Sequence, residues 1–350
     1  MNDEEIDPSV LLKYEILQKL GKGAYGVVWK AIDKKTREMV AVKKIFDAFQ
    51  NATDAQRTFR EVVILQELGV HENIVNLMNV LKSESNKDLY LVFDYMETDL
   101  HAVIRAKIMA DIHKQYITYQ LLKCLKYIHS SGVIHRDLKP SNILLNSECF
   151  VKLADFGLAR SLNSLHADST LVLTDYVATR WYRAPEILFG FKNYTTAADI
   201  WAVGCIVAEM YLGKPLFPGT STLHQFEKIF EVTNMPTKAE LAEIYPGINL
   251  SFLEPIRANM KLKQLNSIIG GASDEAKAFI MKLLELNPAK RFSAKEALED
   301  PYLKVFHNEL EEPENTKKVV VSLDDNKKYE ASDYRDKLYS DIKKKKKAHF

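Results

Sequence analysis

The sequence predicts a two-lobed α+β fold, with a small β-rich N-terminal lobe that carries one helix and a large, mostly helical C-terminal lobe. Residues 14–95 contain short runs of β-branched and aromatic residues, which favour strands, around one stretch with helical spacing. Residues 96–304 have apolar residues mainly at helical spacing. No internal repeat or low-complexity linker interrupts them. We therefore expect one domain over residues 14–304, a lead-in over 1–13 and a C-terminal extension over 305–350.

Composition and charge are those of an ordinary globular chain. Of the 350 residues, 47% are hydrophobic and 27% are charged, which supports a sizeable core. The net charge of +1 is too small to attract nucleic acid or an anionic membrane surface through the overall electrostatic field of the protein. The longest apolar runs are too short to cross a bilayer, the acidic N-terminus lacks an apolar signal core, and the three cysteines have no metal-binding spacing. We expect reduced thiols, no nucleic-acid or membrane partner, and a location in the cytoplasm, with the nucleus as an additional location.

The first predicted element is a pair of strands joined by a glycine-rich turn. Strand-like residues 14–20 lead into Gly21-Lys22-Gly23-Ala24-Tyr25-Gly26, and β-rich residues 27–32 follow. A lone G-x-G-x-x-G can also open a dinucleotide-binding unit, in which a helix follows. Because a second strand follows here, we favour a flap whose backbone N–H groups closely approach phosphate oxygens.

The next strand and helix supply a candidate ion pair. Lys43 ends the strand-like run Val40-Ala41-Val42-Lys43, and Glu61 lies within residues 55–68, which have helical spacing. An isolated strand lysine is usually solvated, and Glu61 alone would suit an ordinary charged helix face. Beside a phosphate-binding flap, Lys43 is suited to hold nucleotide phosphates and Glu61 to orient it.

The chain is organised around the segment His135-Arg136-Asp137-Leu138-Lys139-Pro140-Ser141-Asn142, with Asp155-Phe156-Gly157 further along. Asp137 is a candidate acceptor for a hydroxyl proton, and Lys139 can neutralise charge on a transferring phosphoryl group. Asn142 and Asp155 are hard oxygen ligands suited to magnesium. A His-Arg-Asp triplet alone is too common to indicate a catalytic site. The long match, followed by the second motif at this distance, does indicate one. Since these parts come from both lobes, we expect the active site in the cleft between them.

These motifs resemble those of protein kinases, and Lys139-Pro140 resembles the serine/threonine type. The resemblance implies ATP and Mg²⁺ as cofactors, with Lys43 at the α- and β-phosphates. It also implies that Phe93 closes the back of the nucleotide pocket, that backbone groups of Asp94 and Met96 bind adenine, and that Asp99 faces the ribose. The full set of implied nucleotide-binding residues is Leu20, Gly21, Lys22, Gly23, Ala24, Tyr25, Gly26, Val28, Ala41, Lys43, Phe93, Asp94, Met96, Asp99, Ser141 and Leu144.

The segment before Ala184-Pro185-Glu186 contains Thr174-Asp175-Tyr176, and here the resemblance narrows to mitogen-activated protein kinases, whose Thr-x-Tyr lip is doubly phosphorylated. Two phosphates bring roughly −3 to −4 charge at neutral pH. Bidentate arginine–phosphate pairs are strong and would order the lip. By the family pattern, phosphorylated Thr174 draws on Arg57, Arg60, Arg136 and Arg160, and phosphorylated Tyr176 draws on Arg180 and Arg183.

The wider sequence is similar to the atypical extracellular signal-regulated kinase seven/eight branch of that group, whose members phosphorylate their own lip. The resemblance implies a proline-directed serine/threonine protein kinase that is activated by phosphorylation of Thr174 and Tyr176, with autophosphorylation as one route. It also implies that Asp199 braces the catalytic loop and that Arg291 pairs with Glu186. One alternative is a cyclin-dependent or glycogen-synthase-kinase-like enzyme, which the Thr-x-Tyr lip disfavours. The other is a non-catalytic scaffold of kinase shape, which the complete set of catalytic residues disfavours.

The extension over residues 305–350 has mixed charge and weak periodicity, and by the family pattern it wraps back over the small lobe. Ser322-Leu323-Asp324-Asp325 resembles an acidic docking patch, which would let a monomeric enzyme bind protein substrates, an upstream kinase and phosphatases. A solvated acidic turn is an equal alternative. The run Lys343 to Lys347 suits either a nuclear-import address or a frayed terminus.

Overall fold

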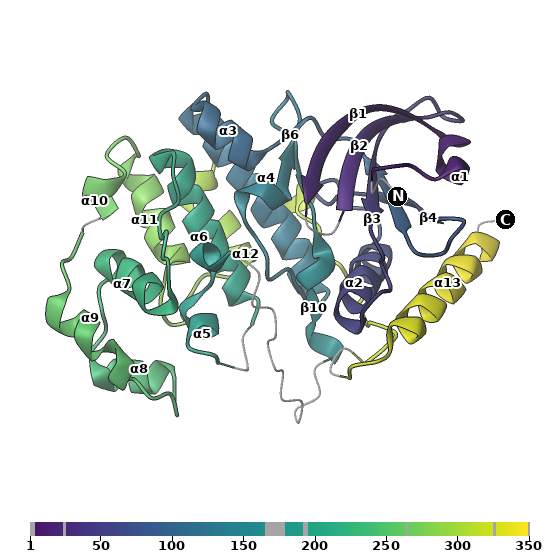
Figure 1. Cartoon of the computed structure of the whole chain (residues 1–350). Coiled ribbons are helices and arrows are strands. Elements are labelled where there is room, and N and C mark those ends of the chain that lie inside the picture. Colours follow the sequence, from purple (N-terminus) through teal and green to yellow (C-terminus); the bar gives the residue numbers. More distant parts are fainter. Residues whose placement is uncertain are drawn as a thin grey trace.

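The computed structural model describes residues 4–23, 26–164, 179–191, 195–263, 265–324 and 327–348. A small lobe is built on a five-stranded sheet, and a larger lobe is mostly helical (Figure 1). The predicted α+β class and two-lobed architecture are therefore confirmed.

The sheet of the small lobe is antiparallel and has the order β1-β2-β3-β5-β4. Its first three strands lie close to the predicted runs 14–20, 27–32 and 40–43. At the glycine-rich turn, a Cβ at position 26 would collide with the backbone carbonyl oxygen of Lys44, so only glycine fits the close approach of β2 to β3. The strands are β1 (Tyr14–Gly23), β2 (Gly26–Asp33), β3 (Met39–Ile45), β4 (Leu77–Lys82) and β5 (Leu89–Asp94).

The two faces of this sheet bury different side chains, as the alternation of strand residues requires. One face joins the main core through α2 (Ala52–Leu68), which buries Phe59 among other side chains. The other face forms a separate small core with Tyr90 and is covered by Val10 of α1 (Pro8–Leu11). The lead-in therefore contributes a helix to the small lobe.

Helix α2 includes the predicted residues 55–68 and begins three residues earlier. Its start is set by Asn51, whose side-chain oxygen accepts the backbone N–H of Asp54 at 2.9 Å. It ends at Gly69, whose positive φ of 71° stops the helix. These two caps fix the register that turns Glu61 toward the cleft.

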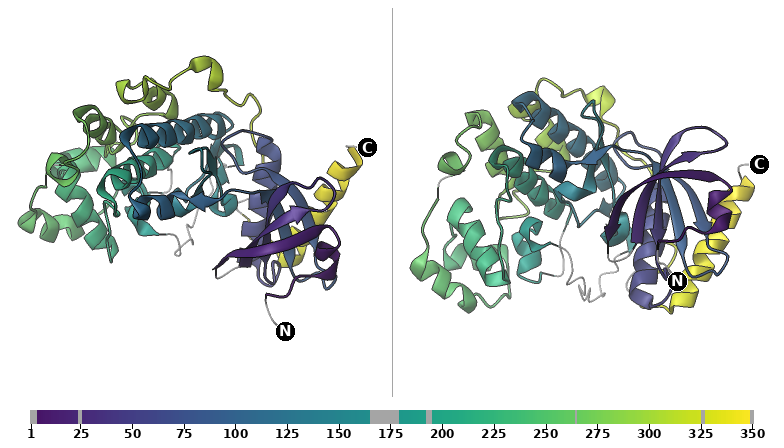
Figure 2. Two further views of the ribbon diagram at one scale, coloured as in Figure 1. Left: turned by 90° about the horizontal axis from the view of Figure 1, so that it is seen from above. Right: turned by 45° about the horizontal axis from the view of Figure 1, so that its top comes forward.

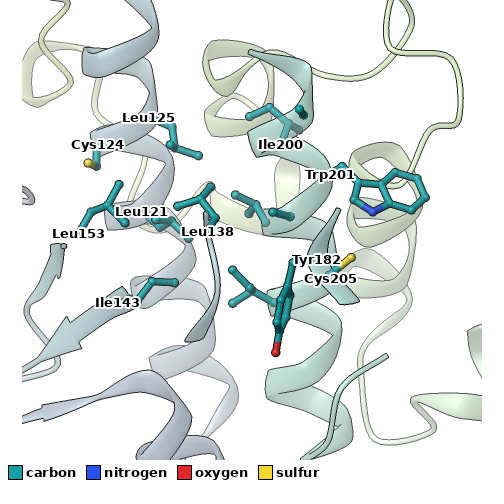
Figure 3. Packing of buried hydrophobic residues seen from close by; sticks show 14 of the residues in the cluster. Leu121, Cys124, Leu125, Leu138, Ile143, Leu153, Tyr182, Ile200, Trp201 and Cys205 are labelled. Carbon is teal, nitrogen blue, oxygen red and sulfur yellow. The ribbon is translucent and has the colours of Figure 1, made fainter. Parts of the chain in front are cut away.

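The large lobe packs around α4 (Asp111–Ser130) and α6 (Ala197–Leu212). Figure 3 shows Leu138 between Leu121 of α4 and Ile200 of α6. Leu138 is 2% exposed and directly follows Asp137, so the packed core fixes the catalytic loop. The other helices of this lobe are α3 (Leu100–Ala106), α5 (Pro185–Leu188), α7 (Thr222–Thr233), α8 (Lys238–Ile244), α9 (Glu254–Asn259), α10 (Leu265–Ile268), α11 (Asp274–Leu283) and α12 (Ala294–Leu298).

Two small sheets and short 3₁₀ turns frame the catalytic loop at the edge of the large lobe. The first sheet has the order β6-β8-β9 and the second pairs β7 with β10. Their strands are β6 (Thr98–Asp99), β7 (Val133–Ile134), β8 (Ile143–Leu145), β9 (Val151–Leu153) and β10 (Arg160–Ser161). The turns at these loops are η1 (Pro140–Asn142) and η2 (Phe156–Leu158). The other 3₁₀ turns of the described residues are η3 (Leu162–Ser164), η4 (Arg180–Tyr182), η5 (Ser251–Leu253), η6 (Pro301–Leu303) and η7 (Glu309–Glu311).

The extension returns to the small lobe and ends in α13 (Ala331–Ala348), a long helix that its weak periodicity did not predict. Figures 1 and 2 show α13, in yellow, alongside α2. The ring centroids of Tyr334 and Phe59 lie 5.6 Å apart, and Leu338 is fully buried. The expected wrapping over the small lobe is confirmed. None of the helices in the described ranges is long and apolar enough to cross a membrane.

Candidate active site

Asp199 of α6 holds the catalytic loop from beneath. Its carboxylate accepts the backbone N–H groups of His135 and Arg136, each at 2.9 Å, and lies 2.9 Å from Nε2 of His129. Burial acts to raise the pKa of Asp199, but the hydrogen bond from His129 and nearby positive charge outweigh it, so the pKa lies below its ordinary value. Arg136 adopts a positive φ of 70°, which bends the loop at this brace. The predicted role of Asp199 as a brace is confirmed.

Asp137 lies within a small hydrogen-bonded group. Nζ of Lys139 donates to its Oδ2 at 2.8 Å. Nδ2 of Asn142 donates to the same oxygen at 3.1 Å and to the backbone carbonyl of Asp137 at 2.8 Å. The structure thus brings together three residues that the sequence singled out. A carboxylate fixed beside an ammonium suits the orientation of a hydroxyl next to a transferring phosphoryl group.

The candidate metal ligands are joined through backbone contacts. The N–H of Ala154 donates to the carbonyl of Asn142 at 2.9 Å, and Nε2 of His135 lies 3.0 Å from the carbonyl of Ala154. Asp155 follows with a left-handed backbone, at φ 63° and ψ 73°. Burial acts to raise the pKa of Asp155, but Lys43 and other cations outweigh it and lower the pKa. The carboxylate is therefore ionised at neutral pH, as a magnesium ligand must be.

The ion pair expected between Lys43 and Glu61 is present. Nζ of Lys43 lies 2.8 Å and 3.0 Å from the two carboxylate oxygens of Glu61. Burial favours the neutral amine, but the carboxylates of Glu61 and Asp155 outweigh it and raise the pKa of Lys43. Lys43 is therefore a cation held between α2 and the metal-binding loop.

A cavity of about 230 Å³ opens beside this ion pair. It forms the phosphate end of the predicted pocket, because the glycine turn, a cation and the carboxylate of Asp155 meet there. Predicted residues on its wall are Gly23, Gly26, Val28, Lys43, Glu61, Asp155 and Arg57, the last predicted for the lip. The wall also includes residues that were not predicted as site residues, namely Ile45, Phe46, Asp54, Thr58 and Gly157.

The donor set suits magnesium bound to a polyphosphate. Across the described ranges, no three His, Cys, Asp or Glu side chains gather into a site that could hold a metal ion. The cleft instead offers one carboxylate, from Asp155, and one amide oxygen, from Asn142. Magnesium usually takes one or two such protein ligands and completes its shell with phosphates and water. The residues present therefore fit the expected cofactors.

The hinge residues lie away from this cavity, and their nucleotide contacts stay predictions. Phe93 is 8% exposed and pairs with Ala41 across the sheet, and its expected place at the back of the pocket stays a prediction. The carboxylate of Asp94 accepts the N–H of Asn76 at 2.9 Å and lies 2.9 Å from Nζ of Lys152. These contacts tie the hinge to both lobes.

The remaining predicted pocket residues are distributed around the flap and the floor. One carboxylate oxygen of Asp99 caps α3 through the N–H of Ala102 at 2.9 Å, so its expected contact with the ribose stays a prediction. Nζ of Lys22 lies 3.2 Å from Glu4 on the lead-in. Leu20 and Gly21 lie in β1, Met96 follows β5, Ser141 lies in η1 and Leu144 in β8, whereas Ala24 and Tyr25 lie outside the described residues.

Several of the predicted phosphate-binding arginines converge behind the metal-binding loop. Nη1 of Arg60 donates to the carbonyl of Gly157, and Nη1 of Arg136 donates to that of Leu158, both at 3.1 Å. Arg57 reaches the cavity wall, and Arg160 lies in the adjoining β10. Arg183 lines a hollow of about 20 Å³ beside Asp137, whereas Arg180 is half-buried and donates to the carbonyl of Thr220 at 3.4 Å. Thr174 and Tyr176 lie outside the described residues.

Two buried pairs hold the segment after the lip. Arg291 makes the predicted pair with Glu186, with nitrogen–oxygen distances of 2.8 Å and 3.0 Å. The Oη of Tyr182 donates to Oε2 of Glu209 in α6 at 2.7 Å. This second contact was not predicted, because nothing in the sequence of α6 distinguishes Glu209 from a surface glutamate. Burial raises the pKa of Glu209, which makes a hydrogen-bond donor at this carboxylate valuable.

A second open hollow, of about 280 Å³, lies on the large lobe. Tyr116 and Phe306 line it, together with Ile112, His113, Ser147, Glu148 and Cys149. Neither of the predicted docking aspartates is among its lining residues. Asp324 is half-buried, and its backbone carbonyl accepts the N–H of Lys327 at 3.1 Å, whereas Asp325 lies outside the described residues.

Comparison with known proteins agrees with this geometry. The protein kinase domain family matches residues 14–303. The chain is 56% identical over 352 residues to "Extracellular signal-regulated kinase 2" of Dictyostelium discoideum, which covers 99% of this chain and 94% of that protein. It is 51% identical to "Mitogen-activated protein kinase 15" of Xenopus laevis over 99% of this chain and 59% of that protein. It is 47% identical to "Extracellular signal-regulated kinase 7" of Drosophila melanogaster over 96% of this chain but only 37% of that protein. The chain belongs to the protein kinase family, as a serine/threonine kinase of the mitogen-activated group on its atypical branch.

Proposed function

We propose that this kinase transfers the γ-phosphate of ATP to serine or threonine hydroxyls that precede proline, and that phosphorylation of Thr174 and Tyr176 activates it. The observation that carries the proposal is the closed ion pair of Lys43 and Glu61 beside the ionised Asp155. A non-catalytic scaffold of kinase shape would not need Lys43, Glu61 and Asp155 to lie together in this arrangement.

Each catalytic residue has a task that follows from its surroundings. Bound ATP with magnesium supplies the phosphoryl group and screens its charge. Lys43, oriented by Glu61, would hold the nucleotide phosphates under the glycine turn, and Asn142 and Asp155 would hold the metal. Asp137 would accept the hydrogen bond of the substrate hydroxyl. Lys139, already 2.8 Å from that carboxylate, would neutralise charge as the phosphoryl group moves.

The preference for proline is supported by the residues next to the catalytic loop. It is carried over from Val177, Ala178 and Arg183, which match the family's pocket-forming segment, although the first two lie outside the described residues. Arg183 and Tyr182 line the hollow beside Asp137. A peptide array that differs only in proline or alanine after the acceptor tests this. We expect proline to raise kcat/KM by about tenfold or more, that is by at least ~1.4 kcal/mol.

Activation through the lip is supported by the arginines that gather behind the metal-binding loop. Arg60 and Arg136 already hold adjacent backbone carbonyls, so a phosphate bound to them would be linked directly to the position of Asp155. Each charge-assisted contact contributes about 1.5–3 kcal/mol before the cost of ordering. Two phosphates could therefore supply the ~5.5 kcal/mol that moves a 1:99 equilibrium to 99:1.

The route of activation is tested with the purified chain. Incubated with ATP and magnesium alone, it should gain phosphate on Thr174 and Tyr176, as measured by mass spectrometry. Asp137→Asn, prepared and treated identically, should gain none. If the variant purified from the same host carries both phosphates, a separate upstream kinase is responsible, and autophosphorylation is refuted while activation by the lip stands.

Protein partners would bind outside the cleft. The open hollow on the large lobe favours a basic peptide with an apolar residue, because Tyr116, Phe306 and Glu148 line it. Phe306 stacks on Tyr119, which feels the negative charge of Glu311 and Glu312. A fluorescent peptide of that type should lose affinity to Glu311→Lys. If Asp324→Lys has the larger effect, the docking surface is the predicted acidic patch instead.

For location we propose the cytoplasm with entry to the nucleus. The proposal is supported by three free thiols, of which Cys124 and Cys205 are buried, and by the lysine run that ends α13. Imaging of a tagged chain tests it. Replacement of Lys343 to Lys347 by alanine should abolish nuclear signal, and unchanged distribution would show that the run is only a solubilising terminus.

A further inference from the structure

The first residues after the metal-binding loop are tied to the C-terminal extension at one backbone group. The carbonyl oxygen of Val319 accepts two hydrogen bonds. The hydroxyl of Ser161 donates one at 2.6 Å, and Nδ2 of Asn163 donates the other at 3.1 Å. Val319 is fully buried, and Ser161 is 1% exposed. Two side chains of the segment that leads into the lip are therefore satisfied by one peptide group of the extension, 158 and 156 residues away in sequence.

The same site joins a third segment, the turn between α4 and β7. The N–H of Val319 donates to the carbonyl of Ser131 at 3.0 Å, and Nδ2 of Asn163 lies 3.2 Å from that same carbonyl oxygen. The N–H of Leu162 donates to the carbonyl of Gly132 at 2.7 Å. A Cβ at Gly132 would lie 2.6 Å from Nδ2 of Asn163, and the φ of Gly132 is +81°, so this close approach requires glycine.

This cluster, which we call the Val319 anchor (Ser131, Gly132, Ser161, Leu162, Asn163 and Val319), lies next to both functional loops. Backbone pairing of Ser161 with Val133 and of Arg160 with Ile134 joins it to β7, and β7 leads directly into the catalytic loop. Arg160 and Ser161 follow the metal-binding loop without a gap. A shift of this anchor would therefore move the base of the lip relative to Asp137.

The extension continues from the anchor to α2. After Val319 the chain reaches α13, in which Tyr334 packs against Phe59 and Tyr339 lies 5.8 Å from Phe49. Helix α2 carries Glu61. The stretch from Val319 to Tyr334 thus contacts the residues that lead into the lip at one end and the helix of the catalytic ion pair at the other.

We propose that Ser161 and Asn163 are positioning residues, which hold the start of the lip by hydrogen bonding to the backbone of Val319. The C-terminal extension would then contribute to catalysis as well as covering the small lobe. If Ser161 loses this acceptor, its buried hydroxyl is left without a partner, and the segment must open to water to satisfy it. Asn163 is exposed, so the loss of its bond to Val319 removes a contact that positions the segment without stranding a buried group. The contacts that hold the catalytic loop and the metal-binding loop in position relative to each other are then weakened. The kinetic part of this inference rests on the proposed function, whereas the anchor itself does not.

Hydrogen exchange in the full-length chain tests the anchor. Asn163→Asp keeps the shape of the side chain and removes its donors, and Ser161→Ala removes the hydroxyl. We expect each to speed exchange of the Val319 amide by about tenfold or more. Ser340→Ala, an exposed change on α13, is the matched control and should leave it unchanged. Ser161→Thr keeps the hydroxyl and should stay near the parent value. Unchanged exchange at Val319 in both test variants would refute the anchor, whatever the activity.

Steady-state kinetics separate positioning from mere stability. Because the wall of the nucleotide cavity contains none of the anchor residues, the test variants should keep the KM for ATP within about twofold while kcat for a peptide falls by about fivefold or more. Faster exchange with an unchanged kcat would show that the anchor is only structural. A parent chain that transfers no phosphate to any peptide would count against the proposed function and leave the exchange result valid.

Discussion

Replacement of Arg291 by methionine should destabilise the large lobe more than any surface ion-pair change. Its side chain is 0% exposed and Glu186 is 1% exposed. Besides the two bonds to Glu186, its guanidinium donates to the carbonyls of Glu285 at 2.8 Å and Ala197 at 2.7 Å. Methionine fills much of the volume but leaves a buried carboxylate and two carbonyls without their donors. Breaking a buried ion pair in this way costs about 3–5 kcal/mol.

That cost predicts a large and measurable shift in unfolding temperature. At about 2–4 °C per kcal/mol for a domain of this size, Arg291→Met should lower Tm by about 6–20 °C. The matched control is Lys238→Met, because Lys238 also lies close to a carboxylate, 2.6 Å from Glu254, but the two side chains are 66% and 49% exposed. An exposed pair contributes about 0.2–1 kcal/mol, so the control should move Tm by no more than about 4 °C. Equal shifts in differential scanning fluorimetry would refute the assignment of this pair as a main support of the lobe.

Four further outcomes follow from the site. Asp155→Asn should remove nearly all phosphoryl transfer without unfolding the chain, and near-normal turnover at saturating magnesium would contradict the metal assignment. Phe93→Gly should open a cavity behind the nucleotide and admit bulky adenine analogues. A competition binding assay in which the parent and the variant exclude these analogues equally would contradict this. Tyr182→Phe should lower kcat for peptides and leave the KM for ATP unchanged, because it strands the carboxylate of Glu209 without touching the nucleotide cavity. Burial lowers the pKa of His71 to about 4, so between about pH 6.5 and 4 the unfolded chain binds more protons than the folded chain. The folded chain should therefore lose stability as the pH falls over this range. The Tm of His71→Asn should depend less on pH over the same range.

The elements near the cleft were predictable because each has its own local signal. The two strands around the glycine turn and helix α2 show clear periodicity, α2 also has ordinary caps, and the structure departs from the expected ranges by only a few residues. The extension is the exception. Helix α13 is long but rich in charge, and its apolar stripe is narrow because only one side of it packs against α2.

The pairs of the site divide in an informative way between predicted and missed contacts. Lys43 with Glu61 and Glu186 with Arg291 were predicted, because both partners are side chains of opposite charge and each belongs to a recognisable motif. The brace by Asp199 was predicted because it lies in a motif of its own, although the partners of its carboxylate are backbone N–H donors.

Contacts from a side chain to a distant backbone carbonyl were missed, and the reason is physical. Every residue has a carbonyl, so the acceptor leaves no mark in the sequence, and only the donor can be seen. Arg60 was predicted as a ligand of the phosphorylated lip, and in the structure it donates a hydrogen bond to the carbonyl of Gly157. Nothing in the sequence around Ser161 indicates that its partner is the carbonyl of Val319. Such contacts hold loops in position without constraining the residue type of the acceptor. Kinases that share every catalytic motif can therefore differ in how their lips are held, because the path of the backbone that supplies the acceptors can change while the motifs stay the same.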